Sequence, residues 1–349
     1  MNQRCGHAKG ARVRLISEEM TNLLDIPVEL PTIEEIQQGN RFRAYLNYLS
    51  ALSSFLGDVE ADPGTLLKPV VESLPFQRIK RKQNIDRQQL GRSLRNAWFT
   101  EVQLNIPSEF PDFLSYSIHW APIQSYYATY HVLRSYYLAS NRDVGRAHAT
   151  TLKTIGEVIH QRPQLFPYPW RVYCTGNPEV SLPQLVNLPA GTSISKISPL
   201  SLSHNVSSWD SFAMFLKTTR QRQLDVDVEE WKRKQKAKRL RPGVKQALVA
   251  SLPRATTLFD CLYRLRIRSN YVDADSFLLG VYESEDASDF HKALTRICWS
   301  TLLILEILIA RHVGKQAFGT IVTEFLKHEK KGWSKKLIAL RWESIKASM

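Results

Sequence analysis

The chain has 349 residues, of which 43% are hydrophobic, a composition that excludes a disordered protein and predicts a globular one with a sizeable core. Lys and Arg number 47 against 33 Asp and Glu, which gives a net charge of +14. An excess of this size indicates a phosphate-rich partner such as nucleic acid. General solubility, or pairing with an acidic protein, is the alternative explanation.

The first region, residues 1–110, shows helical patterns at about 33–57 and 84–99, with a loop from Asp58 to Gly64. A basic stretch lies between the two patterns and contains Arg78, Lys80, Arg81 and Lys82. Such a run is either a solvated face or a face that contacts phosphates.

The second region, residues 111–160, is strongly helical. Apolar and aromatic side chains recur there at spacings of three and four, as expected for one stripe along a helix: Ile123, Tyr126, Tyr130, Leu133 and Tyr137. Asn141 to Gly145 is predicted to be a turn, and a second helix is expected at about 147–159.

Residues 161–254 form the third region and are predicted to be a large insertion. Seven prolines between Pro163 and Pro199 exclude a continuous helix, so we expect an irregular excursion, with or without short strands. Helix resumes near Trp209, and the segment from Lys217 to Lys245 carries eleven basic residues against four acidic ones. Its densest part contains Lys232, Arg233, Lys234, Lys236, Lys238, Arg239 and Arg241. A segment of this kind predicts salt-sensitive binding that is largely blind to sequence.

The last regions are residues 255–314 and a basic helical tail, 315–349. Thr257 and Asp260 have the spacing of a capping box that opens a helix reaching about residue 268. A polar loop is expected at 283–288, followed by a helix over 289–312. Its most apolar run, Ile297 to Ala310, contains Glu306 and has 14 residues, fewer than the roughly 20 that cross a bilayer. We therefore expect a buried core helix and no membrane partner.

The four cysteines are widely separated and form no CxxC pair, which favours reduced thiols in a cytoplasmic protein over zinc sites or disulfides. The acidic pairs Asp225/Asp227 and Asp273/Asp275 lack a third oxygen ligand at a suitable spacing. We expect no metal and no cofactor.

Two segments resemble prokaryotic HEPN domains (higher eukaryotes and prokaryotes nucleotide-binding), in the branch with a YYAMFHA-like helix. The first is the helix SYYATYHVLRSYYLA, and the second is LYRLRIRSNYVDADSF, which begins at Leu262. The resemblance covers roughly 112–160 and 255–312. It implies a mainly α, HEPN-like helical bundle with an N-terminal helical region and an irregular Pro-rich insertion. Members of this family are often dimers, and a homodimer or a protein partner subunit is expected here.

Many family members are metal-independent ribonucleases that use an Arg and a His four to six residues apart. A His can move the proton of the 2′-hydroxyl, and an Arg can stabilise the charge that builds on the phosphate. In this chain Arg268 is followed by Tyr271 where a His is expected, and the spacing occurs instead at Arg142 and His148. Arg264, one helical turn before Arg268, is either a phosphate clamp or part of an internal salt-bridge network.

Two functions follow. The first is a HEPN-like protein that binds nucleic acid, RNA in preference to DNA, and acts as a ribonuclease effector of a toxin–antitoxin or antiviral system. The second is a non-catalytic helical scaffold or accessory subunit that holds RNA or DNA within a larger complex.

Overall fold

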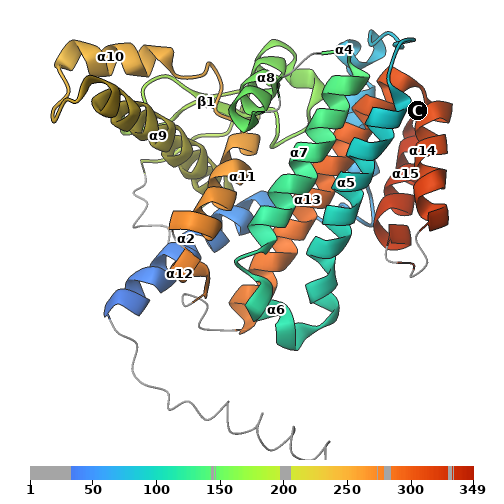
Figure 1. Cartoon of the computed structure of the whole chain (residues 1–349), viewed down its shortest axis with the longest axis horizontal. Coiled ribbons are helices and arrows are strands. Elements are labelled where there is room, and N and C mark those ends of the chain that lie inside the picture. The colour runs from blue at the N-terminus through green and yellow to red at the C-terminus, as the bar shows by residue number, and fades with distance from the viewer. Residues whose placement is uncertain are drawn as a thin grey trace, which may run out of the picture.

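Three long helices form the centre of the molecule: α5 (Arg87–Asn105), α7 (Ala121–Ala139) and α13 (Ser284–Val313) lie side by side (Figure 1). The computed structural model describes residues 33–142, 145, 147–196, 206–272, 274–278, 284–328, 332 and 334–349. Helices dominate this part of the chain, and the predicted mainly α class is confirmed.

The helix α13 lies in the middle of the core. Its residues 297–310 are buried, Glu306 included. By length and composition it is the one helix among the described residues that is apolar enough to cross a membrane, and 89% of its most apolar window is buried within the protein. This burial is compatible with the core helix of a soluble protein.

Other helices cover the central three. The first helix of the described chain, α2 (Ile33–Ser54), packs against α13. The other covering elements are α3 (Gly64–Val71), α4 (Leu74–Gln77), η1 (Ile106–Glu109), α6 (Pro111–Ser117), α14 (Lys315–His328), η5 (Lys335–Ala339) and α15 (Leu340–Ser348). One contiguous core joins residues from Phe42 to Ile345, so helices on both sides of the predicted boundary at 110 share it.

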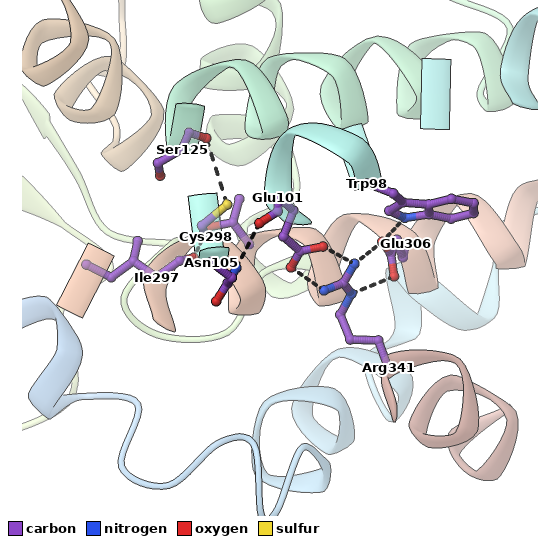
Figure 2. Close-up of polar contacts among 9 residues, drawn as sticks. Trp98, Glu101, Asn105, Ser125, Ile297, Cys298, Glu306 and Arg341 are labelled. Carbon is purple, nitrogen blue, oxygen red and sulfur yellow. Dashed lines mark hydrogen bonds and ion pairs between the residues drawn. The ribbon is translucent and has the colours of Figure 1, made fainter. Parts of the chain in front are cut away.

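A buried group of charges ties the C-terminal helix to the centre (Figure 2). Arg341 of α15 has no exposed surface and lies between Glu101 of α5 and Glu306 of α13. Its guanidinium donates hydrogen bonds to both carboxylates, at 2.8 Å to Glu101 Oε2 and 2.9 Å to Glu306 Oε1. The indole of Trp98 donates to the same Glu306 oxygen at 2.8 Å. Each charged group is therefore paired, as burial requires.

The Pro-rich excursion is irregular, as predicted. After α8 (His148–Gln161) and η2 (Pro163–Leu165) it contains one small antiparallel pair, β1 (Tyr173–Thr175) and β2 (Gln184–Val186). Arg220 fixes the excursion to the helices, because its buried guanidinium donates to the carbonyl oxygens of Gly176 (2.7 Å) and Pro253 (2.8 Å).

The remaining helices are α9 (Ser208–Gln235), α10 (Pro242–Ser251), α11 (Leu258–Ile267), the π-helical turn η4 (Arg268–Val272) and α12 (Ala274–Leu278). The predicted capping box opens α11: Thr257 Oγ1 and backbone N–H both donate to Asp260 Oδ2 at 2.8 Å. The predicted loop at 283–288 is wrong from residue 284 onward, because α13 begins there. Glu285 and Asp286 lie in its first turn, where acidic side chains favour a helix N-terminus.

Candidate functional site

An aromatic cluster surrounds His148, the first residue of α8. Its Nδ1 lies 2.8 Å from the hydroxyl of Tyr126, with which it forms a hydrogen bond. The imidazole is 4.4 Å from the ring centre of Tyr130 and stacks on Tyr263 of α11 at 5.8 Å. Tyr126 and Tyr130 are four residues apart on α7, so they present one face to the start of α8. The arrangement holds a half-buried histidine in a fixed orientation.

Arg266 of α11 adds a cation to the same cluster. Its guanidinium lies 5.4 Å from the ring centre of Tyr127 and 5.7 Å from that of Tyr271, and it donates a hydrogen bond of 3.1 Å to the Tyr127 hydroxyl. The Nε of Arg266 is buried without a hydrogen-bond partner among the described residues. Tyr271 is 67% exposed on the π-helical turn η4, a type of turn that is frequent at functional sites.

Burial lowers the pKa of His148 below its usual value, and the positive charge of Arg266 lowers it further. The pKa of the neighbouring His131 is lowered in the same way, first by burial and then by Arg134 and His148. His148 is therefore uncharged at neutral pH and able to accept a proton, and Arg266 supplies a fixed positive charge beside it.

Arg142 lies in a different environment from His148. Its backbone N–H donates to the carbonyl oxygen of Tyr137 at 2.9 Å. Burial lowers the pKa of His312 to about 4, and the charges of Lys82, Arg142 and Arg162 contribute to the shift. Among the described residues, Arg266 is thus the arginine whose charge lowers the pKa of His148, whereas the charge of Arg142 lowers the pKa of His312. Residues 143 and 144 of the predicted turn lie outside the described part of the chain.

Another predicted arginine, Arg264, contacts α9 rather than the His148 cluster. Arg264 donates hydrogen bonds to the hydroxyls of Thr218 (2.6 Å) and Thr219 (3.2 Å) on α9. Arg268 begins the π-helical turn. The four-residue spacing of Arg264 and Arg268 correctly indicated one shared face, but Arg266 points to the opposite side, toward the tyrosines of α7. The sequence contained a signal for Arg266, because this arginine lies on the face of α11 that meets the tyrosine stripe of α7.

The basic segment predicted at 232–241 forms the tip of a projecting helical hairpin. The last buried residue of α9 is Leu224, and beyond it α9 and α10 extend away from the central helices (Figure 1). Lys236 ends α9 in a left-handed conformation, with φ of 50°. Pro242, at the first position of α10, starts that helix rather than simply breaking the chain.

Two of the seven predicted cations on the hairpin are paired locally. Lys232 contacts Glu229 at 2.9 Å, and Lys234 contacts Glu230 at 2.6 Å. The other five are exposed and have no ion pair within the described ranges: Arg233, Lys236, Lys238, Arg239 and Arg241. We call these five the hairpin cations. Trp231, half-buried, is the one aromatic side chain in the segment, so the hairpin offers charge rather than a surface for base stacking.

The basic stretch after α4 lies at the C-terminal end of α13. Arg78, Lys80, Arg81 and Lys82 are exposed. The backbone N–H of Lys82 donates to the carbonyl oxygen of His312 at 2.9 Å, and the Arg81 guanidinium lies directly against Gly314. Positive charge at this end complements the partial negative charge of a helix C-terminus, which gives the stretch a structural role in addition to any contact with phosphate.

The described ranges contain no group of three or more side chains suited to hold a metal ion; Asp273 lies outside them. No known protein family, no curated protein and no solved structure matches the chain.

Proposed function

We propose that the protein binds nucleic acid, RNA in preference to DNA, through the α9–α10 hairpin. The observation that carries the proposal is the set of five hairpin cations, which are exposed, form no salt bridge within the described part of the chain, and lie on an element that projects from the core. The RNA preference and the HEPN-like identity of α7, α8, α11 and α13 rest on the sequence resemblance. A role in toxin–antitoxin or antiviral defence rests on analogy to that family alone.

Electrostatics explains why a hairpin of this kind would bind a polyanion. Each phosphate that a Lys or Arg neutralises releases condensed counterions, and this gain in entropy drives sequence-independent binding. The exposed side chains of the hairpin can reach a phosphate backbone without rearrangement of the core. An acidic protein surface has a lower charge density than RNA, so RNA should displace an acidic protein from the hairpin in a competition experiment.

Charge reversal on the hairpin tests the proposal. Lys238, Arg239 and Arg241 are replaced by Glu, and binding to a labelled single-stranded RNA is measured by gel-shift titration. Loss of three phosphate contacts should weaken binding by about tenfold or more at physiological salt. The matched control reverses three exposed cations elsewhere, Arg87, Lys327 and Lys335, and produces the same change in net charge. Equal affinities of the two variants would refute the hairpin as the binding element.

Metal-independent RNA cleavage at His148 is a second candidate function. The specific observation in its favour is a half-buried, uncharged imidazole fixed by Tyr126, with the Arg266 cation beside it. His148 would accept the proton of the 2′-hydroxyl as its oxygen bonds to phosphorus, and Arg266 would stabilise the phosphate charge. The P–O5′ bond then breaks to leave a 2′,3′-cyclic phosphate, and the 5′-oxygen takes a proton from the protonated His148. Arg266 takes the role that the sequence suggested for Arg142 or Arg268, while His148 and Tyr271 remain candidates from the sequence, with the Tyr271 ring beside the Arg266 guanidinium.

Labelled RNA incubated with the protein in EDTA tests cleavage. His148→Ala and Arg266→Gln should abolish it, whereas Arg142→Gln should leave it unchanged, because the charge of Arg142 contributes to the pKa shift of His312 and not to that of His148. If the wild-type protein cuts no RNA, the non-catalytic scaffold is the function, and RNA binding by the hairpin stands independently.

A further inference from the structure

A cavity of about 440 Å³ lies at the base of the hairpin, between α8, α9 and α11. This volume is within the range of sites that hold small molecules. The cavity lies behind the His148 cluster, because Tyr263 belongs to both: its ring stacks on His148 and also lines the cavity wall.

The walls of the cavity are largely apolar. Leu152 comes from α8, Val226 from α9 and Ile267 from α11, and the Tyr263 ring completes the surface. A planar heterocycle that enters such a slot loses contact with water and gains dispersion and stacking contacts.

Positive side chains surround the same cavity. Lys153 and Arg222 are exposed where they line it. Arg264 and Arg268 line it from α11 and the π-helical turn, and the Nε of Arg264 is buried without a hydrogen-bond partner among the described residues. Arginine side chains suit a phosphate group, since the guanidinium presents paired donors that match its oxygens.

One acceptor distinguishes this cavity from a site for a simple anion or a fatty acid. Asp227 lines it, is partly buried, and forms no hydrogen bond or ion pair with the rest of the described chain. A carboxylate beside an apolar slot accepts hydrogen bonds from ring or exocyclic N–H groups such as those of a nucleobase.

We propose that the cavity binds one nucleotide: the base enters the apolar slot against Tyr263, Asp227 accepts from its N–H groups, and the cationic rim holds the phosphate. The nucleotide is either free or an unpaired unit of a bound strand. If the nucleotide belongs to a bound strand, the inference rests on the proposed function. In that case α9 connects the cavity to the hairpin cations, so that one strand can contact both. Val226 of α9 and Lys236, which directly follows the last residue of α9, are ten residues apart, about 15 Å along the helix axis.

Filling the slot tests the proposal. Val226 is 48% exposed, so Val226→Trp should block the cavity without disturbing the core. The matched control is Val180→Trp, at an exposed valine that does not line the cavity. Binding of the four nucleoside 5′-monophosphates and of inorganic phosphate is measured by calorimetry on each protein. Binding of a single-stranded RNA is measured on the same samples.

Val226→Trp should weaken monophosphate binding by about tenfold or more, the effect of losing one stacking contact, and the Val180 control should bind as the wild type does. If RNA affinity falls together with monophosphate affinity, the nucleotide belongs to a strand; if it is unchanged, the ligand is a free nucleotide. The proposal is overturned if no monophosphate binds at millimolar concentration, if inorganic phosphate binds as tightly as the monophosphates, or if Val226→Trp binds normally.

Nucleotide binding by the cavity and RNA binding by the hairpin can be refuted independently of each other. The charge-reversed hairpin should bind RNA about tenfold or more weakly and keep monophosphate binding, because its substituted residues lie outside the cavity. A protein that binds RNA but no monophosphate refutes the cavity alone, and one that binds monophosphate but no RNA refutes the hairpin alone.

Discussion

Replacement of Arg341 by Met should destabilise the protein strongly. The guanidinium is fully buried and makes four hydrogen bonds, two to each of the carboxylates of Glu101 and Glu306. Met has a similar length but leaves both carboxylates buried without a cation. Removing one partner from a buried ion pair costs about 3–5 kcal/mol. That loss is a large part of a total free energy of unfolding of about 5–15 kcal/mol.

The effect of pH on this variant has a defined sign. Burial already raises the pKa of Glu101 above its usual 4.5, although Arg341 opposes the shift. Without Arg341 the pKa rises further, so the folded state binds more protons than the unfolded state above pH 4.5. The free energy of unfolding should therefore fall as pH rises through that window, by about 1.4 kcal/mol per pH unit for each extra proton bound.

Urea unfolding, followed by circular dichroism at several pH values, measures both effects. Arg78→Met, the loss of an exposed cation, is the control and should change stability little. The triple variant Glu101→Gln, Glu306→Gln, Arg341→Met should recover most of the loss, because no unpaired charge remains. A single Arg341→Met variant within about 1 kcal/mol of the wild type would refute the reasoning.

Further predictions concern the histidines and the capping box. Arg266→Gln should raise the pKa of His148 and leave His312 unchanged, whereas Arg142→Gln should raise that of His312 from about 4 and leave His148 unchanged. Proton NMR titration of the imidazole signals measures both pKa values. A changed pKa of His312 in Arg266→Gln, or of His148 in Arg142→Gln, would contradict the assignment of each arginine to its histidine. Thr257→Ala should lower the free energy of unfolding by about 1 kcal/mol, since it removes the N-cap of α11; an unchanged thermal midpoint would count against that role.

The sequence predicted the long elements well because their signals are local. Spacings of three and four placed the stripe on α7, a capping box placed the start of α11, and prolines excluded helix from the excursion. The short helices α3 and α4 were missed, because each has only one or two turns and depends on packing against larger helices.

The site was harder to predict than the fold. Tertiary packing selects Arg266 over Arg268 as the cation beside His148, and linear spacing to a histidine does not contain that information. The spacing of Arg142 and His148 fitted the resemblance, but the start of α8 turns His148 toward α7, while Arg142 remains near the end of α13. The basic character of the hairpin was easier to predict, since the density of Lys and Arg is visible in the sequence itself.

The salt dependence of RNA binding tests the central proposal most directly. If the five hairpin cations contact phosphates of a single strand, the logarithm of the binding constant should fall with the logarithm of salt concentration with a slope of about −3.5. Reversal of Lys238, Arg239 and Arg241 should reduce that slope to about −1.4. A wild-type protein that binds no RNA at low salt, or a slope that is the same in both proteins, would contradict the account.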